Sequence, residues 1–290
     1  MPAARGDART ILALLGGPAA PVATGLTFVA SEALEPLARG VETPAARLAR
    51  ACDELALDFA FVPVTAPWAS EACAALVAAG RAPLVAIDGP LARAARQEGV
   101  EEVLKATVLD PDGVRALLRL RMRAVAEDVA RASDMGASAV VVCEDLAGSA
   151  GPIVSPDWAN EDLFPLLAEV VAEATGAGLH AVLHCDGDFR AFLPAIARAG
   201  LVAVHGGGHG AAGLDGVLAA ARAAGVAFVG GLPTEALDAG LPATIAAGRR
   251  VGVLALSGGL LIADDGGITS AVQVAFLASA FSAARSTGRG

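Results

Sequence analysis

Two clusters of side chains that transfer protons, attack carbon or bind metals follow two apolar, β-branched runs of this sequence. The clusters comprise Cys143, Glu144 and Asp145 after the first run, and His184, Cys185 and Asp186 after the second. Parallel α/β proteins carry their chemistry where buried strands end. The two clusters therefore predict an active site at the ends of two neighbouring strands.

His184 is the strongest single candidate, because an imidazole at the end of an apolar strand needs buried hydrogen-bond partners or a metal. Asp186 falls on the same face of the strand end, whereas Cys185 is offset by one residue and would face the opposite side. One reading is a proton-transfer pair, in which Asp186 orients the His184 ring or raises its pKa. The other is a metal site of mixed nitrogen and oxygen ligands built on His184 and Asp186. Asp264, Asp265 or Cys143 would complete it.

The elements that position these residues alternate as strand and helix along the whole chain. Strands are predicted at residues 25–30, 59–64, 84–88, 139–143, 181–184, 202–205, 227–230 and 251–256. Amphipathic helices are predicted at 43–57, 112–135, 157–175, 214–224 and 234–247. Eight strands with crossover helices favour a single-domain (β/α)8 TIM barrel over residues 1–290, with 1–24 as an N-terminal helical extension. A doubly wound open sheet is the alternative.

In a barrel, several polar residues would converge just past the strand ends. Asp88 ends the third strand, His205 and His209 follow the sixth, and Asp264 and Asp265 come after the eighth. The predicted catalytic residues are His184, Asp186, Asp145 and Asp265, and the predicted metal ligands are His184, Asp186 and Asp264. For Asp145, Asp157 and Asp264, an ordinary turn or capping role is an equal alternative. Lys105 lies away from any strand end, which argues against a Schiff-base mechanism.

Glycine pairs after the last strands suggest a second feature, since glycine lets backbone amides approach a ligand closely. The predicted ligand-binding glycines are Gly207, Gly230, Gly231, Gly258 and Gly259. Together they predict an anion or a flat ligand over the barrel mouth, although glycine also simply makes tight turns.

Composition restricts the function classes. The 290 residues are 55% hydrophobic with a net charge of −10, which argues against a nucleic-acid or anionic-membrane surface. No long uninterrupted apolar stretch or signal-peptide pattern is present, and the four cysteines show no disulfide or zinc-ribbon spacing, so we expect a cytoplasmic protein. Cys52 and Cys73 fall in helical patterns and are expected to be core residues.

The order of several motifs resembles the uroporphyrinogen decarboxylase superfamily, from about Ser138 to the C-terminus. The matching motifs are the acid-acid-Leu-Ala of 144–147, Gly151-Pro152 with Ser155-Pro156, Phe164-Pro165, the Leu-His-Cys-Asp-Gly-Asp of 183–188, Gly258-Gly259, and the Asp-Asp-Gly-Gly-Ile of 264–268. The resemblance implies a TIM barrel. It also implies one of two activities: decarboxylation in the haem pathway, or methyl transfer between methylated corrinoid proteins and thiols or folate.

Two departures from the superfamily patterns bear on this choice. The decarboxylase resemblance would imply an N-terminal arginine-rich segment and a following Pro-Glu-Tyr, and this chain has neither and no tyrosine. The methyltransferase resemblance would imply a zinc site made by His-x-Cys and a later Cys. Here His184 matches the histidine, Asp186 stands at the first cysteine and Gly266 near the second, so that zinc site is incomplete.

Three functions follow from the resemblance. The first is a methyltransferase of the corrinoid-linked type, with zinc as a possible cofactor and a corrinoid presented by a partner protein. The second is a decarboxylase acting on a carboxylated, tetrapyrrole-like or smaller substrate, with Arg190 as the nearest arginine to the His184 motif. The third is a barrel that binds a tetrapyrrole or corrinoid without catalysis. The alanine-rich surface of 214–224 would suit a homodimer.

Overall fold

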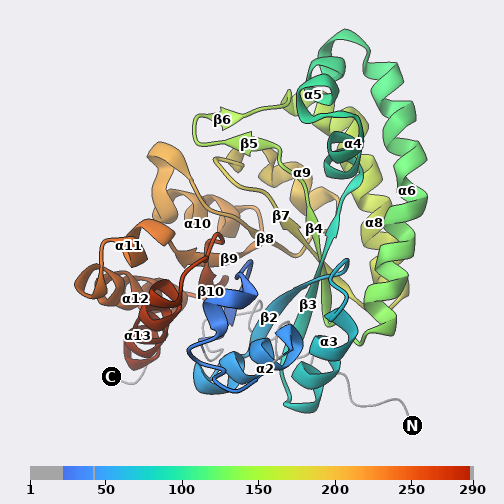
Figure 1. The fold of residues 1–290 in the computed structure, drawn as a ribbon. Helices are drawn as coiled ribbons and strands as arrows, with labels where there is room; N and C mark the ends of the chain where they lie inside the picture. Colours follow the sequence, from blue (N-terminus) through green and yellow to red (C-terminus); the bar gives the residue numbers. More distant parts are fainter. Residues whose placement is uncertain (1–21, 42, 288–290) are drawn as a thin grey trace. The chain divides into compact units, whose positions relative to one another are not determined.

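Eight parallel strands form a closed barrel in the computed structural model, which describes residues 22–41 and 43–287 (Figure 1). In sequence the strands are β1 (Thr24–Leu26), β2 (Phe59–Pro63), β3 (Ala82–Asp88), β4 (Ala139–Cys143), β7 (His180–His184), β8 (Ala203–His205), β9 (Ala227–Leu232) and β10 (Leu260–Asp264). Around the barrel the order is β1-β10-β9-β8-β7-β4-β3-β2. The predicted TIM barrel is confirmed, and closure excludes the doubly wound open sheet. The predicted helical extension over 1–24 lies outside the described residues except at its end, where Thr24 begins β1.

Helices connect the strands. The α-helices are α2 (Pro44–Glu54), α3 (Ala69–Ala78), α4 (Pro90–Glu98), α5 (Val100–Leu109), α6 (Pro111–Asp134), α7 (Pro156–Trp158), α8 (Phe164–Gly176), α9 (Leu193–Arg198), α10 (Gly213–Ala223), α11 (Thr234–Asp238), α12 (Leu241–Ala255) and α13 (Ala271–Thr287). Shorter turns are the 3-10 helices η1 (Ser31–Leu34), η3 (Arg190–Phe192) and η4 (Gly210–Ala212) and the π-helical η2 (Ala159–Leu163). Among the described helices, none is long and apolar enough to cross a membrane.

The chain divides into two compact units, and the first contains the described residues of Met1–Leu84, Met135–Ser138 and Ala227–Gly290. In this unit β1 pairs with both β10 and β2, and β10 also pairs with β9. Helices α12 and α13 lie side by side (Figure 1). They approach closely because Gly248 has no side chain: a Cβ there would be 2.4 Å from the carbonyl oxygen of Ala280.

The second unit comprises Val85–Asp134 and Ala139–Val226. Its strands β4, β7 and β8 are adjacent, and their registers align Cys143 with His184 and His184 with His205. The β-branched centre of β4 is fully buried, as expected for a strand covered on both faces. After β4, the short strands β5 (Ala147–Gly148) and β6 (Gly151–Pro152) form an antiparallel hairpin. The last residues of β4, β7 and β8 therefore lie next to one another at one edge of this unit.

One predicted strand is wrong. Residues 251–256 complete helix α12, and the strand of this region is β10 at Leu260–Asp264. Val251 and Ala255 are buried one helical turn apart while Val253 is 54% exposed, so this short apolar run follows a helical period. Gly258 and Gly259 both have positive φ and break the chain between helix and strand.

Candidate active site at the carboxyl ends of β7 and β8

Two histidines face one another at the carboxyl ends of neighbouring strands. His184 is the last residue of β7 and His205 the last of β8, and they are register partners. Their Nδ1 atoms are 2.8 Å apart, with ring centroids separated by 5.0 Å. A contact this short is a hydrogen bond, so one Nδ1 carries the proton and the other accepts it. The pair holds a single proton between two nitrogens.

Burial differs between the two rings. His205 is fully buried, whereas His184 is partly exposed at the strand end. Burial lowers the pKa of His184 below its ordinary value, and the negative charges of Asp186 and Asp145 oppose that shift. A neutral imidazole that is accessible and has acids nearby can accept a proton, and the resulting cation would be stabilised by those acids.

Asp186 is held beside the pair by the backbone. Its Oδ1 accepts a hydrogen bond of 2.9 Å from the amide of Gly207, and its side chain is exposed. The neighbouring Gly206 must lack a side chain, because a Cβ there would be 2.1 Å from the carbonyl oxygen of Cys185. Gly207, predicted as a ligand-binding glycine, thus positions a carboxylate in this structure.

His209 lies farther along the same loop. Its ring is buried and packs edge-on against Phe189, with centroids 6.0 Å apart. Burial lowers the pKa of His209, and a hydrogen bond with the backbone of Gly187 opposes the shift. These contacts suit a histidine that fixes the loop after β8.

The two acids after β4 have different environments. Glu144 is fully buried, and its oxygens accept hydrogen bonds from the amides of Leu91 at 2.9 Å and Ala92 at 2.7 Å, in the first turn of α4. Burial raises the pKa of Glu144 to about 8, although these amide bonds oppose the shift. Asp145 is exposed and acts on His184 through its charge. Glu144 therefore joins β4 to α4, and Asp145 remains the acid of this cluster that a substrate can reach.

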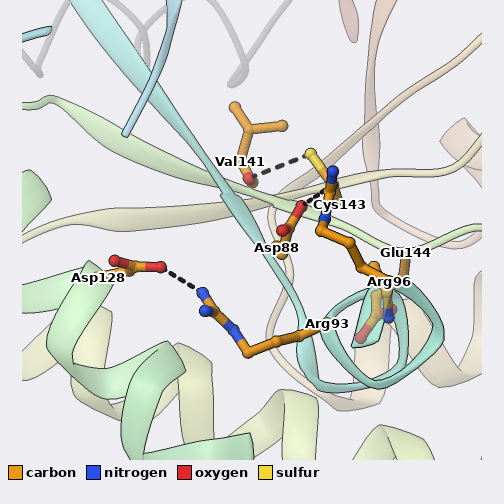
Figure 2. A network of polar contacts seen from close by, with 8 residues as sticks. Asp88, Arg93, Arg96, Asp128, Val141, Cys143 and Glu144 are labelled. Atoms are coloured by element: carbon orange, nitrogen blue, oxygen red, sulfur yellow. Dashed lines mark hydrogen bonds and ion pairs between the residues drawn. The ribbon is translucent and has the colours of Figure 1, made fainter. Parts of the chain in front are cut away.

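Burial disfavours the thiolate form of both cysteines of the site. Burial raises the pKa of the Cys185 thiol to about 12, and that of Cys143 is also raised by burial and by the nearby charge of Asp88. Figure 2 shows the Cys143 thiol directed at the carbonyl oxygen of Val141, 3.8 Å away, and the ion pair of Asp88 with Arg96. This environment favours the protonated thiols and suits small core groups rather than nucleophiles.

The acids predicted after the eighth strand belong to the other compact unit. Asp264 is fully buried, and its carboxylate accepts hydrogen bonds from the Thr27 amide at 2.9 Å, the Thr27 hydroxyl at 2.5 Å and the Gly266 amide at 3.2 Å. Burial raises the pKa of Asp264. Three donors from the protein occupy both carboxylate oxygens, so this side chain links the end of β1 to the end of β10.

Asp265 contacts two of the predicted glycines, Gly230 and Gly231, in the same unit. Asp265 Oδ1 accepts a 2.5 Å hydrogen bond from the Gly231 amide, and a Cβ at Gly230 would be 2.7 Å from the same oxygen. Both glycines lie inside β9 rather than after it. Gly258 and Gly259 precede β10 and are therefore at its amino end, so the prediction that they lie at the barrel mouth is wrong.

The residues present do not fit the expected zinc site. Within residues 22–41 and 43–287, no three His, Cys, Asp or Glu side chains are grouped so that they could hold a metal ion. His184 Nδ1 is hydrogen-bonded to His205, Asp186 Oδ1 accepts from the Gly207 amide, and both oxygens of Asp264 accept from Thr27 or Gly266. Structural and catalytic zinc sites need at least three protein ligands.

The sequence does not identify the partners of His184 and Asp264. For His205 the signal is its position at the end of a strand adjacent to that of His184. Thr27 carries no such signal, because its partner Asp264 is 237 positions away in sequence.

Comparisons with known proteins agree with this architecture. The family model described as "Uroporphyrinogen decarboxylase (URO-D)" matches residues 50–250. A structure described as a methyltransferase from Methanosarcina mazei superimposes with a TM-score of 0.75 at 16% identity, covering 99% of each chain. D-Psicose 3-epimerase from Clostridium cellulolyticum H10 gives a TM-score of 0.57 at 10% identity, covering 91% of this chain and 99% of the other. At these identities the two structures share the fold. No curated protein sequence matches the chain.

Proposed function

The chain belongs to the uroporphyrinogen decarboxylase family, and from that premise we propose that it is a methyltransferase of the corrinoid-linked type. In this proposal His184 is the general base for the methyl acceptor. The observation that carries the proposal is the 2.8 Å contact between the Nδ1 atoms of His184 and His205. That the methyltransferase from Methanosarcina mazei has the same fold supports the proposal at the level of the scaffold.

The chemistry needs one proton acceptor at the site. A thiol acceptor becomes nucleophilic when it loses its proton, and the sulfur electron pair then forms the new bond to the methyl carbon. A corrinoid presented by a partner protein would supply that methyl group and keep the electron pair of the broken bond. The thiol proton passes to Nε2 of His184, which requires the tautomer in which His184 Nδ1–H donates the hydrogen bond to Nδ1 of His205. Asp186 and Asp145 would stabilise the imidazolium that forms.

Arginine pairing favours methyl transfer over decarboxylation. A decarboxylase must bind a substrate carboxylate, and Arg190 was the predicted cation for that purpose. Its guanidinium makes two hydrogen bonds with the carboxylate of Asp188, at 2.8 and 2.7 Å. Arg96 is likewise paired, at 2.7 Å from Asp88. Both arginines are thus neutralised by acids of this chain, and a polycarboxylated substrate would have to displace those acids.

The test is incubation of the purified full chain with methylcobalamin and 2-mercaptoethanol, with the thioether product measured by mass spectrometry. We expect thioether formation that falls by roughly 10² to 10⁴ in His184→Gln and is insensitive to chelation with EDTA, with far less than one zinc per chain by elemental analysis. No thioether, together with release of carbon dioxide from a pyrrole carboxylate such as pyrrole-2-carboxylate, would establish the decarboxylase instead. Saturable binding of cobalamin without either product would establish the binding barrel. Zinc near one per chain, lost in His184→Ala and Asp186→Ala, would restore the metal site.

A further inference from the structure

A cavity of about 310 Å³ lies in the first unit at the carboxyl ends of its strands. Its walls come from the segment after β1 (27–31, with Leu34), from Phe61 and Pro63 at the end of β2, and from the segment after β10 (267–269). Pro44 and Leu48 of α2 and Trp68 complete the lining. A volume at the lower end of the range for small-molecule sites fits one compact ring system, but not a tetrapyrrole with its carboxylate side chains.

The wall between β1 and β10 is held in place by hydrogen bonds. Val29 pairs with Ile268 as a parallel bridge beyond the strands, and the Ala30 amide donates a 2.9 Å hydrogen bond to the carbonyl oxygen of Ile268. The bonds from Thr27 to Asp264 fix the base of the same wall. The cavity is therefore preformed, which is the usual state of small-molecule sites.

The lining is apolar and aromatic. No lining residue carries a charge, and the rings of Phe28 and Phe61 meet edge to face with centroids 5.4 Å apart. A neutral lining of this kind selects against carboxylates and phosphates, since an ion would lose its hydration without gaining a partner. Aromatic edges and faces instead favour a flat ring.

Ser31 is the lining residue that points to a ligand. It lines the cavity, and its hydroxyl oxygen is buried without a hydrogen-bond partner among the residues that the structure describes. A buried hydroxyl without a partner is unfavourable by an amount comparable to a lost hydrogen bond. A ligand atom that accepts or donates a hydrogen bond at this position would remove that cost.

We propose that this cavity binds a neutral aromatic compound carrying one hydrogen-bonding oxygen, with the ring against Phe28, Phe61 and Trp68 and the oxygen bonded to Ser31. The cavity residues and the His184–His205 pair belong to different compact units. The proposal concerns binding alone, so it stands or fails independently of methyl transfer.

The test uses equilibrium dialysis of the full chain against three matched compounds: 2-naphthol, naphthalene and 2-naphthoate. The wild type is expected to bind 2-naphthol about fivefold more tightly than naphthalene, the ratio for one hydrogen bond of ordinary strength, and 2-naphthoate most weakly. Ser31→Ala is expected to remove the preference for 2-naphthol and leave naphthalene unchanged. Ser286→Ala, at an exposed serine outside the lining, is the matched control.

A variant with a larger lining side chain tests whether the compounds bind in this cavity. Ala30→Leu enlarges the side chain of a lining residue and is expected to weaken the binding of 2-naphthol and naphthalene at least about tenfold, with circular dichroism confirming the fold. Thr269→Leu, at an exposed lining position, serves if Ala30→Leu does not fold. The proposal is overturned if the wild type shows no saturable binding, if the variant with the larger lining side chain binds as the wild type does, or if 2-naphthoate binds as tightly as 2-naphthol.

Discussion

The carboxyl end of β10 and the carboxyl ends of β7 and β8 both carry buried titratable side chains, but they use them differently. At β10, Asp264 is fully buried and three donors from Thr27 and Gly266 occupy its oxygens. At β7 and β8, His184 is partly exposed and its Nδ1 is bonded to another titratable ring, that of His205.

The two regions differ in how many hydrogen bonds the protein makes to the titratable side chain and in whether that side chain is exposed to solvent. A buried acid whose hydrogen bonds are all made to neighbouring backbone and hydroxyl groups is part of the architecture, because any ligand would have to displace those donors. A partly exposed imidazole that is hydrogen-bonded to a second imidazole can exchange a proton with a ligand. Asp264 therefore has the environment of a structural group, whereas His184 has the environment that the proposed general base requires.

Replacement of His184 should have the largest effect. His184→Gln is expected to lower kcat/KM for methyl transfer to 2-mercaptoethanol by roughly 10² to 10⁴, the usual contribution of a general base, with little change in thermal midpoint. His180→Gln is the matched control, because His180 begins the same strand, at its amino end, and should retain the wild-type rate. Equal losses in both variants would show that β7 is needed only as structure.

Replacement of Asp264 should reverse that pattern. Asp264→Ala removes the carboxylate that accepts from the amides of Thr27 and Gly266 and leaves the Thr27 hydroxyl with only the backbone carbonyl of residue 264, and we expect the free energy of unfolding in urea to fall by about 3 kcal/mol. The rate per folded molecule should stay within a few fold of the wild type. Thr27→Ser, which keeps the hydroxyl, should be much milder than Thr27→Val. A folded, stable Asp264→Ala protein without activity would move Asp264 into the chemistry.

Glu144 should give the stability of the protein a pH dependence. Its pKa is about 8 in the folded chain and about 4.3 in an unfolded one, so between these values the folded state holds a proton that the unfolded state has lost. Stability from this group is therefore greatest at low pH and falls as the pH rises to about 8. Glu144→Gln should flatten the fall in thermal midpoint between pH 5 and 8, whereas Glu127→Gln, at an exposed position, should not.

Lys105 should show the smallest effect. It lies in α5 and pairs with Glu101 at 2.7 Å on the surface, as expected from its distance in sequence from any strand end. Lys105→Met should retain the wild-type rate within about twofold, because Lys105 lies in α5 and not at a strand end. The protein should also stay folded, because an exposed ion pair contributes little to stability. Trapping of a substrate adduct by borohydride in the wild type but not in Lys105→Met would contradict this expectation.

Local patterns predicted much of the fold. The run at 139–143 is strand β4 as predicted, because continuous β-branched residues bounded by polar ones fit a strand buried on both faces. The run at 251–256 could not be assigned in the same way, since five or six apolar residues fit a helix end as well as a strand. Only the burial of Val251 and Ala255 one turn apart distinguishes the two.

The site was predicted as far as single residues allow. The predicted strand ends identified His184 and Asp186 as candidates. The pairing of His184 with His205 depends on the register of β7 and β8, which residues adjacent in sequence do not determine. The bond of Thr27 to Asp264 and the cavity around Ser31 join segments from opposite ends of the chain. Such contacts arise only when the barrel closes.

The most direct test of the account is a double-mutant cycle on methyl transfer with His184→Gln, His205→Asn and the combined variant. If the two rings act as one proton-holding unit, each single variant should lose most of the activity and the combination should lose no more than the larger single loss. The pH profile of kcat/KM should shift in His205→Asn, because His205 acts by positioning the proton of His184. Losses that multiply in the combined variant, or a wild-type rate and pH profile in His205→Asn, would contradict the account.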